Sequence, residues 1–534
     1  MDHGEEAWLL KSEERGNDAT ILDSRHHDGR AWTAGNLARP LAHGAVYFAE
    51  LLREIESLGP GDLLLFTDWR GDPDEPLGTD GSQVGQTLCR AARRGVVVKG
   101  LVWRSHLDRL QFSQRENRHL GQEIEAAGGE CLLDMRVRPG GSHHQKFVVL
   151  RHRDRPDLDV AYVGGIDLCH SRNDDADHHG DPNPQPMAAV YGPRPPWHDL
   201  QLEIRGPAVG DVEAIFRERW NDPAPLTRNP VHRIADVLRR DDTRPDPLPE
   251  QWPDPPACGP HIVQLLRTYP YRRRGYSFAP AGERSIARGY RKAIDQARSL
   301  IYLEDQYLWS REVIATFADA LERSPSLHLI AVIPRFPDQD GRMSLPPNLI
   351  GRAQALELLY EASGDRVAVY SIENHAGTPV YVHAKCCVLD DVWASIGSDN
   401  LNLRSWTHDS ELSCAVLDTT LDVREPKALP SGHHPRAYAR DLRLSLAREH
   451  LDRPPGADDD LCDPVTAFHA FADAAAALDA WYDGGRTGPR PPGRLRGYVL
   501  PTLSPRTRRW AGPLYRTIYD PDGRRRSMRR AHAF

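Results

Sequence analysis

Apolar runs and amphipathic stretches alternate along most of the chain. An apolar run that ends in polar residues occupies positions 63–70, and a similar run occupies 300–309. Each is followed by a stretch with helical spacing and then by a second apolar run, at 96–104 and 327–334. Strands that alternate with amphipathic helices are typical of α/β folds. The pattern therefore predicts an α/β protein in which a mixed sheet is flanked by helices.

The same order of segments occurs twice. SHHQKFVVL at 142–150 matches YVHAKCCVL at 381–389, and AYVGGIDL at 161–168 matches ASIGSDNL at 394–401. The offset of about 240 residues is typical of a duplicated domain rather than a solenoid. Two copies that pack about a pseudo-twofold axis bring equivalent segments together. We therefore expect two similar α/β lobes that share one active site.

Lysine is scarce in this chain, with six residues against 62 arginines. Two of the six follow a histidine by two positions, as His144 and Lys146 and as His383 and Lys385. With 24 histidines in 534 residues, about 0.3 such pairs are expected by chance. A lysine ammonium is a compact, strongly hydrated charge, unlike the planar arginine fork. A histidine beside each such charge indicates phosphate chemistry.

Two pairs of aspartates also align between the copies. Asp68 and Asp305 each stand near the end of the first apolar run, 76 and 78 residues before the histidine of the His-x-Lys pair. The segments WHDLQLEI and THDSELSC place Asp199 over Asp409. An imidazole that exchanges protons is oriented by an acceptor on its second nitrogen. We expect Asp199 and Asp409 to orient the two histidines, with strand-entry caps as the alternative. Asp68 and Asp305 are expected either to bind substrate or to cap the turn at the end of their strands.

Two histidines and two lysines at one site can cleave a phosphodiester. The two ammonium groups can neutralise the charge on the phosphoryl oxygens without a metal. One imidazole can attack phosphorus and form a phosphohistidine. The other can protonate the leaving alcohol and then activate water.

These residues resemble the signature of the phospholipase D superfamily, which is His-x-Lys-x4-Asp followed by Gly-Gly or Gly-Ser and an Asn. The second copy fits in full, with His383, Lys385, Asp390, Gly397, Ser398 and Asn400, and the first provides His144, Lys146, Gly164 and Gly165. GGIDLCHSRND, PWHD, VQLLRTYP and IYLEDQY resemble the plant and animal type. The resemblance covers roughly residues 40–450.

The resemblance implies a role for each motif residue. His144 would be the nucleophile and His383 the general acid and base, while Lys146, Lys385 and Asn400 would hold the phosphoryl oxygens. Gly165, Asp167 and Ser398 would contact substrate, although Asp167 stands where the family commonly has Asn, and a carboxylate is a poor phosphate ligand. Asp390 and Glu411 would be structural residues of the motif.

The first copy departs from the signature at one position. Arg151 stands where the motif has Asp, and Asp154, Asp157 or Asp159 could substitute for it. A branch of the superfamily that acts on nucleic-acid ends also has His-x-Lys without that Asp. Arg151 therefore leaves a nuclease activity open.

No metal or other cofactor is expected. The eight cysteines are scattered, which is typical of reduced core thiols rather than of disulfides or a zinc site. The stretch 171–181 is rich in Asp and His. It has no fixed ligand spacing, which favours a solvated loop over a cation site.

Composition favours a cytoplasmic protein. The mean hydropathy is −0.58, no apolar run reaches the length of a membrane span, and the N-terminus does not resemble a secretory signal. The net charge is −8, yet residues 486–534 contain 13 Arg and two Asp. That stretch is either a solvated, partly disordered tail or a basic arm for anionic lipid or nucleic acid. Peripheral membrane binding and signal-less export both stay open.

Five regions are expected along the chain. The linker is placed where proline and acidic residues cluster. The regions are an N-terminal extension (1–40), a first lobe (41–245), a linker (246–262), a second lobe (263–455), and a C-terminal helix with a basic Arg/Pro-rich tail (456–534).

The predicted function is cleavage of a glycerophospholipid such as phosphatidylcholine to phosphatidic acid and the head-group alcohol. Transfer to another alcohol would use the same phosphohistidine. The alternatives are a cardiolipin-synthase-like phosphatidyltransferase, a nucleic-acid phosphodiesterase and a non-catalytic binding protein. The expected partner is phospholipid at a membrane surface, with no stable nucleic-acid complex, and the internal duplication favours a monomer.

Overall fold

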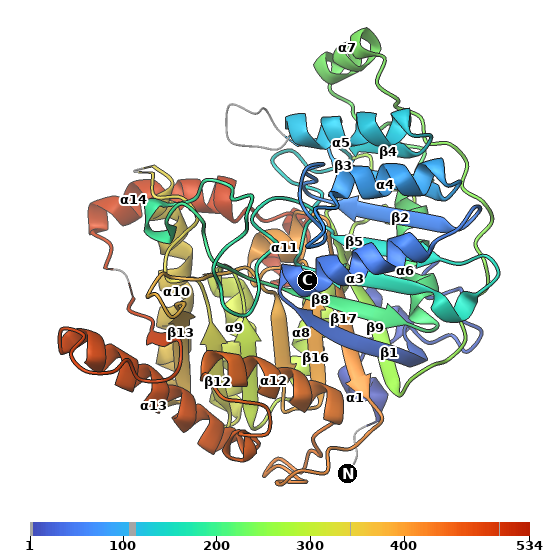
Figure 1. Cartoon of the computed structure of the whole chain (residues 1–534). Helices are drawn as coiled ribbons and strands as arrows, with labels where there is room; N and C mark the ends of the chain where they lie inside the picture. The colour runs from blue at the N-terminus through green and yellow to red at the C-terminus, as the bar shows by residue number, and fades with distance from the viewer. Residues whose placement is uncertain (1–3, 106–113, 342, 501) are drawn as a thin grey trace.

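One long mixed sheet runs through the molecule, with helices on both of its faces (Figure 1). The computed structural model describes residues 4–105, 114–341, 343–500 and 502–534. The predicted α/β class is confirmed.

Both halves of the chain contribute strands. Those of the first half are β1 (Thr33–Ala42), β2 (Leu63–Asp68), β3 (Val97–Trp103), β4 (Glu130–Asp134), β5 (Phe147–Arg151), β6 (Val160–Gly164), β7 (Trp197–His198) and β8 (Leu200–Arg205). Those of the second half are β9 (His261–Tyr269), β10 (Glu283–Arg284), β11 (Leu300–Glu304), β12 (His328–Val332), β13 (Val367–Ile372), β14 (Tyr381–Val382), β15 (Cys386–Leu389), β16 (Trp393–Gly397) and β17 (Glu411–Asp418).

The strand order is the same in both halves when it is followed outward from the middle of the sheet. β1 and β9 pair antiparallel at the middle, with Asn36 opposite His261. Outward from β1 lie β8, β6, β5, β2, β3 and β4, and outward from β9 lie β17, β16, β15, β11, β12 and β13. The last three strands of each series are mutually parallel. Two copies of one unit packed about a twofold axis produce this order, which supports the proposal of duplicated lobes.

Helices cover both faces of the sheet. On one face of the first half lie α3 (Gly44–Ser57), α4 (Val84–Arg93) and α5 (Gln114–Ala126), and on the same face of the second half lie α8 (Ser285–Ile294), α9 (Arg311–Arg323) and α10 (Leu345–Ser363). The other face carries α6 (Ala208–Trp220), α12 (Ala437–His450) and α13 (Pro464–Asp483).

Alternate strand residues enter different cores because successive side chains point to opposite faces. In β2, Leu64 and Phe66 pack with α3, α4 and α5, whereas Leu65 packs with α6. In β11, Leu303 packs with α8, α9 and α10, whereas Tyr302 packs with α12 and α13. The core that holds Leu65 and Tyr302 is continuous under both halves, so it fixes one half against the other.

The N-terminal region belongs to the fold. β1 begins at Thr33, so the sheet of the first half starts before the boundary that was predicted at residue 41. The short helices α1 (Glu5–Trp8) and α2 (Ser12–Arg15) precede it. The guanidinium of Arg15 is buried and donates to the backbone oxygen of Leu265 at 2.9 Å. The N-terminal segment is thereby anchored to the second half.

The arginine-rich C-terminal stretch is folded onto the second half, so its interpretation as a solvated, partly disordered tail is wrong. It forms β18 (Leu495–Gly497), which pairs with β13, and then α14 (Pro505–Leu514), which packs against α10, and α15 (Arg526–Arg530). Phe534 is buried in the core. Arg490, Arg494, Arg496 and Arg524 form ion pairs with acidic residues of the same chain. Because these arginines are paired within the chain, less of the positive charge of this stretch is available to bind anionic lipid or nucleic acid.

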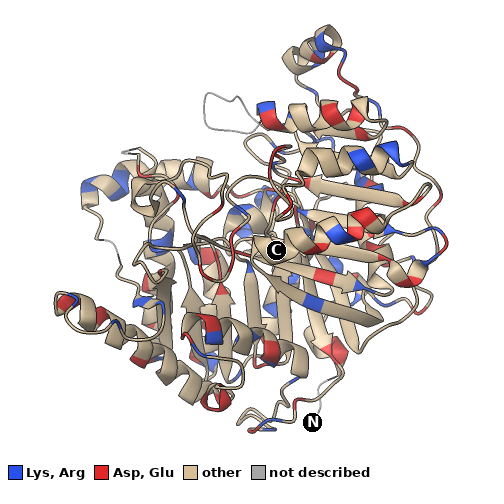
Figure 2. Ribbon diagram, viewed as in Figure 1, with Lys and Arg blue, Asp and Glu red and all other residues tan. Residues whose placement is uncertain are grey.

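One helix projects from the body of the molecule. α7 (Pro230–Arg239) stands beyond α5 at the top of Figure 1. Elsewhere, basic and acidic residues are interspersed along the ribbon of both halves (Figure 2). In the part of the chain that the structure describes, no helix is both long and apolar enough to cross a membrane.

Candidate active site

The backbone of each His-x-Lys segment is hydrogen-bonded to the other half of the chain. His144 N donates to Ser410 O at 2.9 Å, and His383 N donates to His198 O at 2.7 Å. β14, just before His383, pairs in parallel with β7 of the first half. The two motif copies therefore face each other where the halves meet.

The histidine rings are also oriented across the halves. Nδ1 of His383 lies 2.6 Å from Oδ2 of Asp199, and Nδ1 of His144 lies 2.9 Å from Oε2 of Glu411. Each half thus supplies the carboxylate that fixes the imidazole of the other. Nε2 of each ring is left for chemistry.

The prediction that Asp409 orients His144 is wrong. Asp409 accepts from the backbone N of Ser142 at 3.0 Å, from the Ser142 hydroxyl at 2.8 Å and from Nε of Arg404 at 2.7 Å. It therefore holds the segment before His144 in place without contacting the imidazole.

The strand register explains the error. Gly164 in β6 lies opposite Gln201, and Gly397 in β16 lies opposite Ser413. Counting back two residues from each partner makes Asp199 equivalent to Glu411, two positions beyond Asp409. Because side chains alternate along a strand, a shift of two keeps the same face. Alignment of the two His-Asp dipeptides therefore identified the correct face of the strand but the wrong residue as the partner of His144.

Both site lysines are buried, each exposing 2 % or less. Lys146 Nζ donates to the backbone oxygen of His144 at 2.9 Å, and Lys385 Nζ donates to the backbone oxygen of His383. Lys385 Nζ also lies 3.3 Å from Oε1 of Gln306. An ammonium group has three donors, so each lysine retains hydrogen-bonding capacity for an anionic ligand.

The residues after each motif strand shape the site around the carboxylates. A Cβ at Gly165 would lie 2.2 Å from Oδ1 of Asp199, so this position has room only for glycine. Its counterpart Ser398 carries a side chain and donates to Oε2 of Glu411 at 2.6 Å. Asn400 is buried, and its Oδ1 has no hydrogen-bond partner among the described residues.

Two of the predicted substrate-binding aspartates lie near Lys146. Asp167 accepts from the backbone N of Trp69 at 3.1 Å, and its Oδ1 lies 3.6 Å from Lys146 Nζ. Asp68 is buried with an unpartnered Oδ2. Burial and the nearby Asp167 raise the pKa of Asp68 well above its usual value, which favours its protonated form. A protonated carboxyl can donate a hydrogen bond to an anion.

Asp305 does not face substrate as predicted. Its carboxylate accepts from the backbone N of Leu308 at 2.8 Å and of Leu401 at 2.9 Å, so it joins the end of β11 to the loop that carries Asn400. Asp390 has a comparable role at the other end of β11, where it accepts from the backbone N of Ser299 at 2.8 Å. Both carboxylates position motif segments.

Burial and charge set the protonation of the site. Burial, with the charges of Lys146 and Lys385, lowers the pKa of His144 well below its usual value, and burial with Lys385 does the same for His383. Burial opposes ionisation of Asp199, but His383 and Lys385 hold its pKa below the usual range. Burial raises the pKa of Glu411 to about 8 and lowers that of Lys385 to about 8. Burial therefore favours neutral imidazoles and a neutral Glu411 in the resting site.

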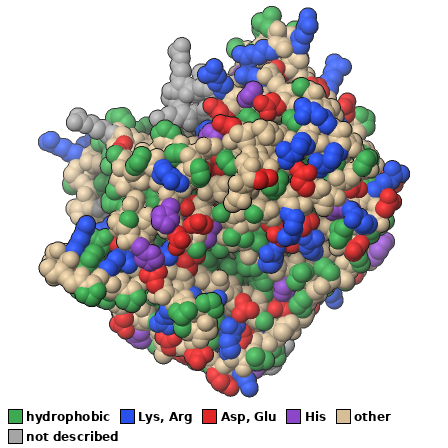
Figure 3. All heavy atoms as spheres, viewed as in Figure 1, with side chains coloured by type: hydrophobic (Ala, Val, Ile, Leu, Met, Phe, Trp, Pro, Cys, Tyr) green, Lys and Arg blue, Asp and Glu red, His purple; other side chains and the backbone are tan. Residues whose placement is uncertain are grey.

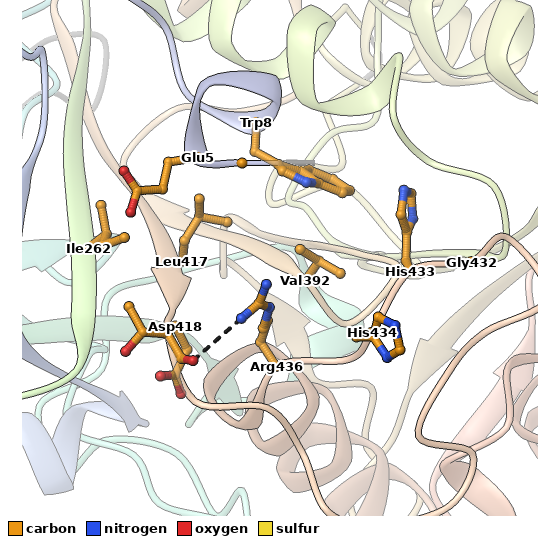
Figure 4. Close-up of a pocket in the computed structure, with 12 residues that line it drawn as sticks. Glu5, Trp8, Ile262, Val392, Leu417, Asp418, Gly432, His433, His434 and Arg436 are labelled. Atoms are coloured by element: carbon orange, nitrogen blue, oxygen red, sulfur yellow. Dashed lines mark hydrogen bonds between the residues drawn. The ribbon is translucent and has the colours of Figure 1, made fainter. Parts of the chain in front are cut away.

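A cleft of about 1140 Å³ is lined by His408, whose Nδ1 lies 3.3 Å from Oδ1 of Asp409, but by no residue of either His-x-Lys pair. Five arginines line this cleft: Arg138, Arg228, Arg272, Arg273 and Arg274. A smaller cavity of about 210 Å³ lies between α1 and the loop around His433 (Figure 4). None of the residues that line the smaller cavity belongs to either His-x-Lys motif.

Comparison with known families matches both halves. A family described as "Phospholipase D" matches residues 74–246, and one described as "Cardiolipin synthase, PLD-like domain" matches residues 290–424. The chain belongs to the phospholipase D superfamily. The two matches include both His-x-Lys pairs.

Several superfamily members are similar over much of the chain. Phospholipase D alpha 1 of Cynara cardunculus is 24 % identical over 69 % of the chain and 58 % of its own length. Phospholipase D alpha 2 of Oryza sativa subsp. japonica is 25 % identical over 73 % of the chain and 62 % of its own length. The chain thus spans about three fifths of these relatives. Phosphatidylserine synthase of Haemophilus influenzae matches 72 % of the chain and 84 % of its own, with 14 % identity and a TM-score of 0.49.

Two residues near the superfamily motif were not anticipated. Gln306 contacts Lys385, and its place directly after Asp305 at the end of a strand was the available signal. The Trp197 ring lies 4.9 Å from the His383 ring, centroid to centroid. No pattern in one sequence distinguishes Trp197 from a core tryptophan.

Arg151 replaces the motif Asp with a different buried network. It donates from Nε to Asp159 at 2.7 Å, to Glu213, and to the backbone oxygen of Pro253 at 2.6 Å. Asp154 and Asp157 are exposed, so Asp159 is the one predicted substitute that enters the network. It does not form the bonds that Asp390 forms in the second half.

In the second half, Asp390 follows β15 and accepts from the backbone that precedes β11. In the first half the equivalent segments are also joined, but the carboxylate belongs to the segment that precedes the strand. Asp62, just before β2, accepts from the backbone N of Arg153 at 2.9 Å. The two equivalent segments are therefore joined, with the carboxylate on the other one. This explains how the first half can dispense with the motif Asp.

We expect Arg151→Met to lower the free energy of unfolding by about 3–5 kcal/mol, because it leaves Asp159 and Glu213 buried without their cation. Arg151→Asp, which restores the motif letter, should destabilise the protein at least as much, since it adds a third carboxylate. The exposed Arg153→Met is the matched control and should change stability by no more than about 0.5 kcal/mol. Urea unfolding measures all three, and a stabilising effect of Arg151→Asp would contradict this account.

Proposed function

We propose that the chain is a phospholipase D-type phosphodiesterase that hydrolyses glycerophospholipids such as phosphatidylcholine to phosphatidic acid and the head-group alcohol. The observation that supports it most is the pair of buried imidazoles, each oriented by a carboxylate from the opposite half and accompanied by a lysine. This arrangement supplies a nucleophile, a proton donor and phosphate-binding cations at one site.

In the first step, Nε2 of His144 attacks phosphorus, and the bond from phosphorus to the head-group oxygen breaks. Substrate brings a negative phosphate beside His383, which raises the proton affinity of that imidazole, so its Nε2 takes up a proton from solvent. His383 then donates its Nε2 proton to the departing oxygen, while Asp199 stabilises the imidazolium. The Nδ1 proton of His144 passes to Glu411, so the phosphohistidine forms without a buried positive charge.

In the second step, water attacks phosphorus and gives a proton to Nε2 of His383. The bond between phosphorus and His144 breaks, and Glu411 returns its proton to Nδ1. Lys146, Lys385 and Asn400 hold the phosphoryl oxygens through both steps. An alcohol that replaces water would give head-group exchange by the same route.

The arginine-lined cleft favours one alternative, a nucleic-acid phosphodiesterase, because arginine forks bind backbone phosphates as well as lipid phosphates. Release of choline from phosphatidylcholine and cleavage of single- and double-stranded DNA, assayed in parallel, separate the two. Choline release that is lost in His144→Ala supports the proposal. Cleavage of DNA alone would replace it with the nuclease.

The pH dependence of cleavage provides a second test. Above about pH 8, Lys385 loses the proton that makes it a phosphate ligand, so kcat/KM should fall. Below about pH 8, Glu411 becomes protonated and cannot accept the Nδ1 proton of His144, so kcat/KM should also fall toward acid. In Lys385→Arg, which cannot deprotonate in this range, part of the alkaline decline should move to higher pH. An unchanged decline would exclude Lys385 as its source.

The apolar face of α7 is suited to contact a lipid surface. Four of its apolar residues are exposed: Val231 by 69 %, Ile234 by 62 %, Val237 by 79 % and Leu238 by 79 %. The helix is anchored from behind, where Arg104 binds the buried Asp236 at 2.9 Å. Its first turn lines the arginine-rich cleft, and apolar and basic side chains lie close together at this end of the molecule (Figure 3). An apolar face bordered by basic residues is typical of interfacial helices.

We therefore expect the double substitution Ile234→Asp and Val237→Asp to weaken binding to anionic phospholipid vesicles by about 10-fold or more, through lost apolar burial. Cleavage of a short-chain, monomeric phosphatidylcholine should be unchanged, because α7 does not contact the motif residues. Val423→Asp, at a residue that is 82 % exposed elsewhere, is the matched control. Vesicle sedimentation measures binding, and unchanged binding of the double variant would exclude α7 as the contact.

A further inference from the structure

A second group of histidines is buried behind His383. Nitrogens of three first-half histidines surround one second-half carboxylate, that of Glu449 on α12, and the four ligand atoms lie within 4.8 Å of one another. The three rings are at most 3 % exposed, and the Glu449 side chain is 13 % exposed. The histidines are His43, His178 and His198.

The outer nitrogens of two rings are committed to fixed acceptors. Nδ1 of His178 lies 3.1 Å from the backbone oxygen of Trp197, which can only accept. Nε2 of His198 lies 2.7 Å from Oε2 of the buried Glu304. In their neutral forms both rings must carry the proton on these outer nitrogens.

The inner nitrogens then direct lone pairs at a carboxylate. Nε2 of His178 lies 3.1 Å and Nδ1 of His198 lies 3.3 Å from the same Oε1 of Glu449, while Nε2 of His43 lies 2.8 Å from Oε2. Two lone pairs that face an anion repel, and either a proton on each ring or one metal cation shared by the rings and the carboxylate removes the repulsion. Histidines that donate outward to a carbonyl or a carboxylate and face inward to a cation are typical of metal ligands.

The spacing of the rings fits a four-coordinate metal. With metal–nitrogen bonds of about 2.05 Å and tetrahedral angles, the ring centroids of two imidazole ligands lie about 5.2 Å apart. The observed centroid separations are 4.9 Å for His43 and His178, 5.2 Å for His43 and His198, and 5.7 Å for His178 and His198. Three imidazoles and one carboxylate are a ligand set that suits Zn²⁺.

Two of the three histidines also have an uncommon backbone. His43 has φ of 71° and His178 has φ of 56°, both in the left-handed region that non-glycine residues rarely adopt. Such residues persist where the surrounding structure holds them, often at functional sites. Here the left-handed turns direct both rings toward Glu449.

We propose that His43, His178, His198 and Glu449 form a structural site for a divalent transition metal, with Zn²⁺ as the expected ion. The metal would join the first half to α12 of the second. It would also fix the backbone of His198, which accepts from His383 N at 2.7 Å and precedes Asp199. The site supports the catalytic imidazole from behind and contacts no phosphate, so the inference does not depend on the proposed activity.

The sequence interpretation did not predict this site. It favoured a solvated loop over a cation site at 171–181, yet His178 in that stretch is completely buried. The neighbouring His179 is exposed beside Asp175 and Asp177. The ligands stand at positions 43, 178, 198 and 449. They have no short spacing that a sequence motif would show, and only the fold brings them together.

Metal analysis of the tag-free, full-length protein tests the proposal. After dialysis against metal-free buffer, about one equivalent of zinc should remain per chain. A chelator should remove it and lower the melting temperature, and added Zn²⁺ should restore both. Co²⁺ added to the stripped protein should give the intense visible bands of a four-coordinate ion. Absence of bound metal, together with absence of these bands after incubation with excess Co²⁺, would overturn the proposal.

Variants locate the metal within the chain. His178→Gln should retain less than about one tenth of an equivalent, whereas His179→Gln, which alters the adjacent exposed histidine, should retain the full amount. Should His178→Gln fail to fold, the Co²⁺ spectrum of the unmodified chain still decides the question. Equal metal content in both variants would place the ion elsewhere and refute the assignment.

Discussion

Alanine at His144 or at His383 is expected to lower kcat for phosphatidylcholine by at least about 10⁴-fold, because each removes a group that makes or breaks a bond. KM should change little, since the two lysines that bind the phosphate remain. The double variant should be no more than slightly slower than either single one, because residues that act in one chemical sequence are not additive. Steady-state release of choline measures all three.

Retention of the fold must accompany this loss. His143 provides the control, because it directly precedes His144 and is fully buried, yet its ring contacts Thr67 and Gln145 instead of the carboxylates of the site. His143→Gln should lower kcat by less than about 10-fold. A comparable loss in His143→Gln would show that general damage to this segment, rather than loss of a nucleophile, explains the effect.

The second large effect is expected at the carboxylates that orient the rings. Asp199→Asn and Glu411→Gln should each lower kcat by about 10²–10⁴-fold, because an amide presents the wrong partner to Nδ1 and cannot stabilise or accept its proton. Asp409→Asn, by contrast, should lower kcat by less than about 10-fold, since Asp409 contacts Ser142, Arg404 and His408 but not the imidazole of His144. A larger loss of kcat in Glu411→Gln than in Asp409→Asn would support the observed strand register over the register that alignment of the two His-Asp dipeptides suggested.

The pH profile distinguishes orientation from simple packing at these positions. Asp199 is ionised in the resting site, so Asp199→Asn should alter the pH dependence of kcat as well as its value. A purely structural residue would lower kcat equally at every pH. Equal losses for Glu411→Gln and Asp409→Asn across the pH range would contradict the assignment of Glu411.

Much of this architecture was accessible from sequence because duplication makes a pattern visible twice. The apolar runs at 63–70 and 300–309 became β2 and β11, and each His-x-Lys pair directly precedes the central strand β5 or β15. A short motif with fixed spacing can be recognised in the sequence because its residues are placed by the local backbone alone. That is why the histidines and lysines were identified before their surroundings.

Long-range register was not accessible. The choice between Asp409 and Glu411 depends on which residue lies opposite Gly397 in β16, a pairing that no local pattern fixes. The packing of the arginine-rich C-terminal stretch against the second half was not predicted, for a similar reason. Its charges are neutralised by acidic residues distant in sequence, such as Glu373, which binds Arg496. Composition reports the charge of a segment and not its partners.

The most direct test of the central claim is a single-turnover reaction of His383→Ala with phosphatidyl-p-nitrophenol. This leaving group departs without a proton donor, whereas hydrolysis of the phosphohistidine still needs His383 to activate water. We predict a burst of about one equivalent of p-nitrophenol per chain and a phosphatidyl adduct on His144 by mass spectrometry. A reaction with neither a burst nor an adduct, or the same burst after His144 is also replaced by alanine, would contradict the account.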